Sequence, residues 1–383
     1  MMGPDQIWPE AVRTLERGQK FALATVINVR GSTPREVGAK MIVRDDGQFG
    51  TIGGGCGEAE VFRKARILLE EGQGARLTEV DLTGDFDQQQ IGTCGGIMDV
   101  FVDIWAPGAD LEIARRLASA AERNRPAALL TLVDSSDPTQ VGARSIVEPS
   151  TADGRLTTTL EIPRRAIAQL AARTGDGVPA LMEISPNGGV NPVTHVESSG
   201  EPRLFLDPIS GAQRLVIAGA GHIAQPLAAL GSMLGFHVTV IDDRASFANR
   251  ERFPGADEIV VRPFTAAIEA LTLDRHCYLV SVTRGHSFDE EVIRTALQHW
   301  RGAFVGMIGS RRRVRATLER IAEGGISVDL IDQVHAPLGM DIAAETPEEI
   351  AVSIIGEIVR ERRSAKRDAG NLGVKIGRLK PSS

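Results

Sequence analysis

The residues with the most specific chemistry in this sequence lie in a glycine-rich segment of its N-terminal half. Three consecutive glycines (Gly53, Gly54 and Gly55) precede Cys56, and Glu58 follows two residues later. Successive glycines allow backbone N–H groups to converge on one anion. A thiol near the N-terminus of a helix has a lowered pKa and more thiolate character. This segment therefore predicts a site for an anionic ligand with a reactive or metal-binding sulfur beside it.

A second glycine-rich segment, GTCGG at residues 92–96, frames Cys94 in the same way. Two such cysteines on separate loops could face one site and bind sulfur, a metal or an electrophile. The alternative is that each cysteine is a small buried apolar residue beside a tight turn, as most free cysteines are. Residue type alone favours this alternative, whereas the repeated glycine frame makes the two interpretations equally strong.

A third glycine-rich segment, GAGHIA at residues 219–224, matches the dinucleotide-binding pattern G-x-G-x-x-G/A. Gly219 permits a tight turn and Gly221 allows a pyrophosphate to approach the backbone. Asp242 ends the next predicted strand, about twenty residues further on, where a ribose diol is usually bound. A carboxylate there favours NAD over NADP, although the nearby Arg244 weakens this preference.

An arginine-rich segment, GSRRRVR at residues 309–315, begins another predicted helix. Ser310 can cap this helix, and Arg311 to Arg313 then crowd its first turn. Cations at a helix N-terminus oppose the helix dipole by a few tenths of a kcal/mol each. Their clustering predicts an anionic partner such as a phosphate, and a solvated basic face is an equally strong interpretation.

The histidines carry less information. His222 lies in the dinucleotide loop, His286 in TRGHSFDEE and His335 in HAPLGMD, and no pair has the i, i+4 spacing of a zinc site. His286, with Asp289 and Glu290, could line the edge of a parallel sheet where Rossmann ligands bind. They could equally be ordinary capping and loop residues.

The predicted elements place these segments at the ends of strands. In the N-terminal half we expect a helix that Gly18 ends, a strand at 21–29, a hairpin with arms MIVR and FGTI turning at Asp46-Gly47, and a helix starting near Glu58 and ending before Gly72. Further elements are predicted at 77–82, 99–105, 127–133 and 163–173. The N-terminal half is thus predicted to be a mixed α+β domain.

Strands and helices alternate regularly in the C-terminal half. Strands are predicted at 215–218, 238–241, 258–261, 278–283 and 303–308, with helices after the glycine loop, at 289–300 and after Ser310. This alternation predicts a Rossmann-type, doubly wound parallel sheet. We expect an N-terminal domain over 1–206, a linker from Leu206 to Gly211, the Rossmann domain over 212–363 and a disordered basic tail over 364–383.

Composition excludes several classes of protein. The net charge of −7 and the single tyrosine argue against general nucleic-acid binding. The sequence has no apolar stretch of the ~20 residues that cross a bilayer, and its charged N-terminus is not typical of a signal peptide. Three cysteines without CxxC spacing argue against disulfides or structural zinc, so a reducing, cytoplasmic location is expected.

Taken together, these motifs resemble the xanthine dehydrogenase accessory family, also called XdhC/CoxI, over most of the chain. The pieces that carry the resemblance are GSTPREVGAKMIV, GTIGGGCGEAEV, TCGG, GAGHIAQPLAAL with VIDDR, VGMIGSRRR and HAPLGMDIAAETPEEIAVSI. Members are thought to bind molybdenum cofactor, to protect it while its terminal sulfur ligand is installed, and to aid its delivery to xanthine dehydrogenase or a related molybdenum hydroxylase. The resemblance implies the same role here.

The resemblance also implies a set of cofactor-binding residues. In the N-terminal domain these are Gly53, Gly54, Gly55, Cys56 and Glu58, with Arg35 and Cys94 in support. In the Rossmann domain the candidates are Gly219, Gly221, His222, Asp242, Arg244, Ser310 and Arg311. One segment departs from the family pattern: its TH-x-x-x-D stretch is TRGHSFD here, with Arg284 after Thr283, which puts any role of His286 in doubt.

Three functions fit these residues. The leading hypothesis is a molybdenum cofactor chaperone without turnover of its own, acting as a homodimer with a molybdenum hydroxylase as its partner. The alternative is a NAD-dependent oxidoreductase, which needs a proton-transfer group that the sequence does not place. A third is sulfur or nucleotidyl transfer to the cofactor, with Cys56 carrying a persulfide supplied by a cysteine desulfurase.

Overall fold

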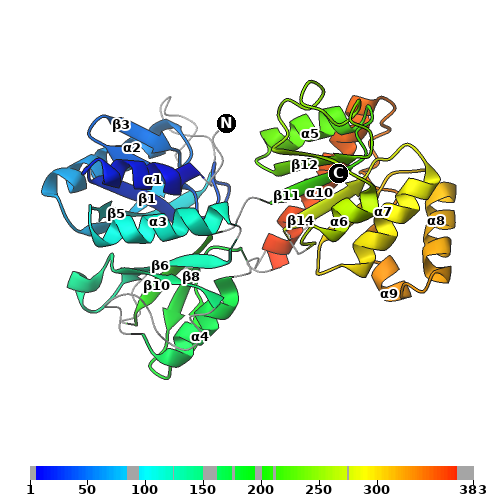
Figure 1. Ribbon diagram of the computed structural model, residues 1–383. Coiled ribbons are helices and arrows are strands. Elements are labelled where there is room, and N and C mark those ends of the chain that lie inside the picture. The colour runs from blue at the N-terminus through cyan, green and yellow to red at the C-terminus, as the bar shows by residue number, and fades with distance from the viewer. Residues whose placement is uncertain are drawn as a thin grey trace, which may run out of the picture. The chain divides into compact units, whose positions relative to one another are not determined.

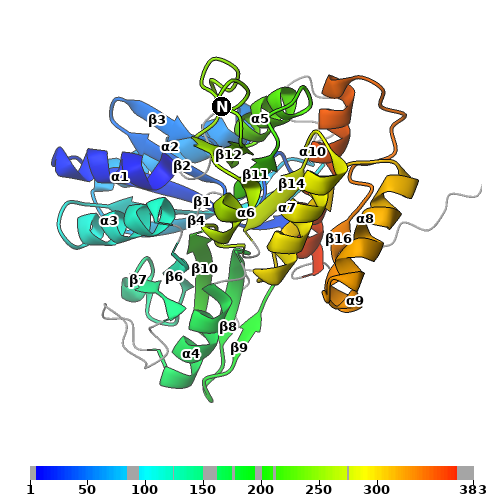
Figure 2. The same cartoon turned by 45° about the vertical axis from the view of Figure 1, so that its right-hand side comes forward.

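The computed structural model describes residues 6–83, 95–123, 125–149, 162–174, 177–194, 201–209, 213–273 and 276–368. The chain divides into two compact units, Met1–Gly211 and Ala212–Ser383 (Figures 1 and 2). Both units are mixtures of helices and strands. Within the described ranges, no helix is long and apolar enough to cross a lipid bilayer.

The first sheet of the N-terminal unit is antiparallel and has the strand order β3-β2-β1-β5-β4. Its strands are β1 (Phe21–Arg30), β2 (Lys40–Arg44), β3 (Gly47–Gly50), β4 (Ala75–Asp81) and β5 (Ile97–Trp105). The helix α2 (Gly55–Glu71) packs on one face through Val61, Ala65 and Leu68. The helices α1 (Ile7–Glu16) and α3 (Ala109–Glu122) pack on the other face. The buried central strand β1 leads into the loop of residues 31–39, which precedes β2.

The second sheet of this unit is also antiparallel, with the order β7-β6-β10-β8-β9. Its strands are β6 (Ala127–Asp134), β7 (Arg144–Val147), β8 (Ala180–Ile184), β9 (Val190–Pro192) and β10 (Arg203–Ile209). The helix α4 (Arg164–Arg173) covers one face. On the other face, Phe205 and Leu181 pack against Ile27 and Phe101 of the first sheet.

The C-terminal unit contains six parallel strands in the order β13-β12-β11-β14-β15-β16. They are β11 (Arg214–Ala218), β12 (His237–Asp242), β13 (Glu258–Val261), β14 (Cys277–Ser281), β15 (Phe304–Met307) and β16 (Val334–His335). One face packs against α5 (Ala224–Met233) and α10 (Pro347–Asp368). The other packs against α6 (Phe264–Glu269), α7 (His286–Gln298), α8 (Arg311–Glu323) and α9 (Val328–Ile331). This doubly wound order confirms the predicted Rossmann-type fold.

Two local predictions about the N-terminal unit were wrong. The helix α2 begins at Gly55 rather than near Glu58, because Gly54 is its N-cap. Cys56 therefore lies inside the first turn of the helix. The hairpin turn is Asp45-Asp46 rather than Asp46-Gly47, because Gly47 already pairs with Arg44.

Two predicted domain boundaries differ from those in the structure. Residues 206–209, expected to be a linker, form the end of β10, where they are buried and pair with β6. The helix α10 continues to Asp368, five residues into the expected tail, while residues 369–383 lie outside the described residues.

Candidate functional site

Three loops of the N-terminal unit meet beyond the end of β1. The loop after β1 contains Pro34, and a Cβ on Gly53 would lie 2.6 Å from the Cγ atom of that proline. A Cβ on Gly96, in the TCGG motif, would lie only 2.3 Å from the carbonyl oxygen of Ser32 in the same loop. Both glycines are therefore required by packing. The GSTP, GGGC and TCGG motifs thus belong to one loop cluster, as far as the described residues of each extend.

Glu58 holds the GGGC loop in place. Its Oε2 atom accepts hydrogen bonds from the backbone N–H groups of Ile52 at 3.0 Å, Gly53 at 3.3 Å and Gly54 at 3.0 Å. The same oxygen accepts from the hydroxyl of Thr51, and Oε1 accepts from the side-chain amide of Gln48 at 2.9 Å. Burial opposes ionisation of Glu58, but the hydrogen bonds from Thr51, Gly54 and Gln48 lower its pKa below the ordinary value.

The amides of the loop thus converge on one anion, which is the carboxylate of Glu58. Such charge-assisted bonds are about twice as strong as neutral ones. The sequence points to Glu58 as a cofactor-loop residue but gives no sign that it is the group that these amides bind.

Other glycines of the cluster face open space. A Cβ on Gly54, Gly55 or Gly95 would meet no other residue within 4 Å. Their φ angles of 78°, 68° and 70° account for the choice of glycine, and the open space allows a ligand to approach the backbone there. Arg35 is exposed on the neighbouring loop. Cys94 lies outside the described residues.

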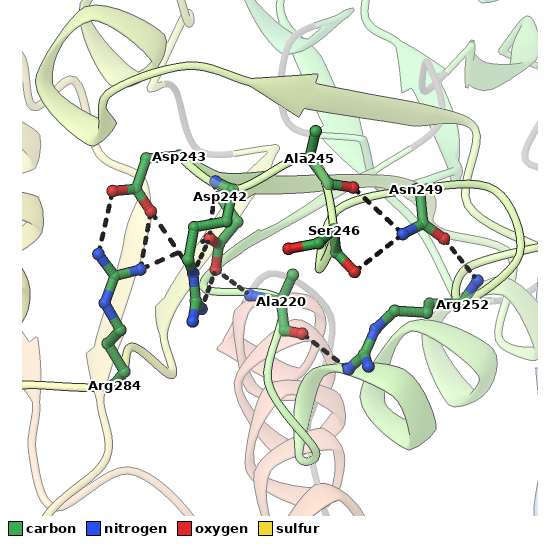
Figure 3. A network of polar contacts seen from close by, with 9 residues as sticks. Ala220, Asp242, Asp243, Ala245, Ser246, Asn249, Arg252 and Arg284 are labelled. Carbon is green, nitrogen blue, oxygen red and sulfur yellow. Dashed lines mark hydrogen bonds and ion pairs between the residues drawn. The ribbon is translucent and has the colours of Figure 1, made fainter.

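The dinucleotide loop of the C-terminal unit sits between β11 and α5. A Cβ on Gly219 would lie 2.7 Å from the carbonyl oxygen of Val282, so this glycine allows the loop to pass close to the end of β14. Gly221 faces open space, and His222 is exposed. The backbone N–H of Ala220 donates to Oδ2 of Asp242 at 2.9 Å (Figure 3).

Asp242 is not free to receive a ligand as the structure stands. This residue is only 1% exposed. Besides the bond from Ala220, it accepts three from Arg244: from the backbone N–H at 3.1 Å, from Nε at 2.8 Å and from Nη2 at 3.0 Å. The carboxylate predicted to bind a ribose diol is therefore paired with a guanidinium group.

Sequence reasoning missed three further charged residues at this edge. Asp243 accepts two hydrogen bonds from Arg284, at 2.8 and 3.0 Å, and this pairing lowers the pKa of Asp243 to about 2 (Figure 3). Arg252 donates to the carbonyl oxygen of Ala220 at 3.1 Å. Arg284 follows the end of β14, and ligands of such sheets bind beyond the carboxyl ends of the strands, so this rule could have identified it.

The arginine-rich helix α8 is capped as predicted, since Ser310 accepts a hydrogen bond from the N–H of Arg313 at 3.3 Å. The Arg313 side chain is paired with Asp289, which is fully buried and also accepts from the hydroxyls of Ser281 and Thr283. Arg311 and Arg312 are exposed. The arginine cluster therefore divides into one structural residue and two that face solvent.

The predicted site residues consequently form two sets, one in each unit. In the N-terminal unit, the described set is Gly53, Gly54, Gly55, Cys56, Glu58 and Arg35; in the C-terminal unit it is Gly219, Gly221, His222, Asp242 and Arg244, with Ser310 and Arg311 at the start of α8. In the part of the chain that the structure describes, no group of three or more His, Cys, Asp and Glu is placed to hold a metal ion.

Comparisons with known proteins match the same two regions. Residues 14–81 match the model of the XdhC and CoxI family, and residues 215–358 match that of the XdhC Rossmann domain. A crystal structure described as a xanthine dehydrogenase from Bacillus halodurans has the same fold, with a TM-score of 0.74 and 24% identity over 96% of this chain and 98% of that one.

Three curated proteins are similar along nearly the whole chain. The uncharacterized protein YqeB of Escherichia coli is 29% identical over 94% of this chain, which spans only 47% of YqeB. A probable xanthine dehydrogenase subunit of Bacillus subtilis is 25% identical over 91% of this chain and 95% of its own length. The molybdenum cofactor insertion chaperone PaoD of E. coli is 23% identical over 94% of this chain and 89% of its own. With both units matched by the family's models, this chain belongs to the XdhC and CoxI family.

Proposed function

We propose that this chain binds molybdenum cofactor through its N-terminal loop cluster, protects it during sulfuration and delivers it to xanthine dehydrogenase or a related molybdenum hydroxylase. The observation that carries the proposal is the position of Gly54 and Gly55, which present open backbone at the start of α2. The similarity to PaoD, named as a molybdenum cofactor insertion chaperone, supports the same role.

The start of α2 fits the anionic part of this cofactor. Glu58 already satisfies the amides of residues 52–54. The first N–H groups of a helix have no partner within the helix, so those of Gly55, Cys56 and Gly57 are the donors that would hold the pterin phosphate. Arg35 would add a positive charge from the adjacent loop. Glu58 is then a positioning residue that shapes the loop without touching the ligand.

Cys56 is the residue that would meet the metal end of the cofactor. It lies in the first turn of α2, where the helix dipole favours a thiolate. When bound, the cofactor supplies a molybdenum centre whose sulfur ligand is exchanged. A thiolate at this position suits either contact with that centre or transient storage of the incoming sulfur.

Storage of sulfur on Cys56 is testable by itself. The thiolate would attack the persulfide of a cysteine desulfurase, forming a new S–S bond at Cys56 and releasing the desulfurase cysteine as a thiolate. Intact-mass spectrometry should then show one added sulfur atom in the wild type and none in Cys56→Ser. If the wild type gains no sulfur, Cys56 is not a carrier.

The binding step is tested by the content of pterin in the purified protein. The full chain is produced in a host that makes molybdenum cofactor, and the released pterin is oxidised and quantified by fluorescence. We expect close to one pterin per chain, and absence of pterin would contradict binding. Delivery is tested separately, because the host's molybdenum hydroxylase should lose activity when the gene for this chain is deleted.

The alternative of a NAD-dependent oxidoreductase makes a different prediction. If the protein binds a nicotinamide nucleotide but the NADH absorbance does not change when a substrate is added, the chaperone function is favoured. Turnover of the nicotinamide would favour the enzyme. Asp289 is not available for proton transfer in the Rossmann unit, since it is fully buried and bound by Ser281, Thr283 and Arg313.

A further inference from the structure

We propose that the Rossmann unit binds a dinucleotide whose adenosine ribose carries a 2′-phosphate, in preference to one with a free ribose diol. This inference concerns the ligand of the C-terminal unit and goes beyond the proposed function of the N-terminal loops. It revises the expectation of NAD, which depended on a free carboxylate at Asp242.

The carboxylate of Asp242 is buried and already bound by other groups of the chain. A ribose diol donates two hydroxyl hydrogen bonds to a carboxylate that faces the ligand. Here that carboxylate is 1% exposed, and its oxygens accept from Ala220 and Arg244. To bind a diol, Asp242 would give up bonds to a guanidinium group, in which both partners are charged, for bonds from uncharged hydroxyl groups.

Three guanidinium groups lie at the end of β12 or at the dinucleotide loop beside it. Arg244 bonds Asp242 and Arg284 bonds Asp243, the two acids at the end of β12. Arg252 bonds the carbonyl oxygen of Ala220 in the neighbouring dinucleotide loop (Figure 3). Three positive and two negative groups leave a local charge of +1. Because a carboxylate at this position normally repels a 2′-phosphate, pairing it with arginine removes the repulsion and leaves excess positive charge.

The three arginine side chains stack on phenylalanine rings. The guanidinium carbon of Arg244 lies 3.7 Å from the ring centre of Phe247, and that of Arg252 lies 5.1 Å from the same ring. The guanidinium carbon of Arg284 lies 4.2 Å from the ring centre of Phe288. Stacking limits the rotation of these side chains, so little conformational entropy remains to be lost when they bind a phosphate. An arginine after the second strand is the feature that accommodates a 2′-phosphate in such folds.

Calorimetry on the full chain tests the proposal with two matched pairs of ligands. NADP⁺ is compared with NAD⁺, and 2′,5′-ADP with 5′-AMP, so that the members of each pair differ only in the 2′-phosphate of the adenosine ribose. We expect the 2′-phosphorylated member of each pair to bind at least ~10-fold tighter, a difference of about 1.4 kcal/mol. Equal or tighter binding of NAD⁺, or no binding of either nucleotide, would overturn the proposal.

Two variants assign the preference to named residues. Arg284→Ala should reduce the ratio of the two affinities toward one, and Arg244→Ala should reverse it, because it frees Asp242 for a diol. Arg315→Ala is the matched control, since Arg315 is an exposed arginine of the same unit that bonds Glu319. It should leave the ratio unchanged. If Arg244→Ala does not fold, the wild-type ratio and Arg284→Ala still decide the question; an unchanged ratio in Arg284→Ala would remove that residue from the site.

Discussion

The Oε2 atom of Glu58 lies 3.0 Å from the backbone nitrogen of Gly54. The C-terminal unit has a counterpart, since Oδ2 of Asp242 lies 2.9 Å from the backbone nitrogen of Ala220. In each unit a carboxylate from a later element accepts from the backbone of a glycine-rich loop, Glu58 from α2 and Asp242 from β12. These loops are therefore shaped by the chain itself before any ligand arrives, which lowers the entropic cost of binding.

Removing the Glu58 carboxylate should loosen the GGGC loop. Glu58→Ala leaves the amides of residues 52–54 without their acceptor, at a cost of about 1–3 kcal/mol. We expect hydrogen–deuterium exchange to accelerate across residues 51–57. Glu60→Ala, which removes an ion pair with Lys64 on the same helix, should leave exchange unchanged. Equal protection of the loop in the two variants would contradict the role of Glu58.

Acid should weaken the same loop. The pKa of Glu58 is lowered, so its stabilising bonds are present at neutral pH and are lost as pH falls through that lowered value. Exchange at residues 51–57 should therefore rise at acidic pH in the wild type and stay constant with pH in Glu58→Gln, after correction for intrinsic rates. A pH dependence shared by both proteins would place its origin elsewhere.

The two glycines of the TCGG motif that the structure describes should differ in their tolerance of alanine. A Cβ on Gly96 would lie 2.3 Å from the Ser32 carbonyl oxygen, whereas one on Gly95 would meet nothing within 4 Å. Gly95→Ala strains the backbone, because Gly95 has a φ of 70°. Gly96→Ala instead forces the loop away from Ser32. We expect it to lower the free energy of unfolding by at least ~1 kcal/mol more than Gly95→Ala in urea titrations. The reverse order would contradict the described packing of the loop cluster.

Asp103 should make the N-terminal unit more stable in mild acid. Its burial between the two sheets raises its pKa to about 6, partly offset by Arg144 at 3.0 Å. A raised pKa contributes stability that is full below the unfolded value of 3.8 and is lost as pH rises through about 6. The free energy of unfolding of the wild type, relative to Asp103→Asn, should therefore fall by on the order of 3 kcal/mol from pH 4 to pH 7. A difference that does not vary with pH would refute the assignment.

Much of this architecture follows from the residue pattern alone. The regular alternation of strands and helices after Arg214 predicts the parallel sheet, because such strands are buried on both faces and read as short apolar runs. The end of β10 was harder to recognise, since Asp207 and Pro208 are typical of a turn. Asp207 is tolerated in a buried strand because Lys40 of the other sheet lies 2.7 Å from its carboxylate. A partner so distant in the chain leaves no local signal.

The candidate site could likewise be predicted only in part from the sequence. The glycines of both loops are visible in the sequence because their backbone angles exclude other residues. What the carboxylates do is not visible, because Glu58 and Asp242 act by hydrogen bonds whose direction depends on tertiary packing. Arg252 was missed for the same reason, because it reaches the carbonyl oxygen of Ala220 only through the tertiary fold. Arg284 was missed although its place after β14 could have identified it.

The most direct test of cofactor binding at the start of α2 compares two glycines that cap helices of the N-terminal unit. Gly54 caps α2 and Gly108 caps α3; both have backbone angles that favour glycine, and neither would bring a Cβ within 4 Å of another residue. Gly54→Ala and Gly108→Ala should each cost about 1–3 kcal/mol of stability. We predict that the pterin content per folded chain falls at least several-fold in Gly54→Ala and stays at the wild-type level in Gly108→Ala. Equal pterin content in the two variants would contradict binding at this loop.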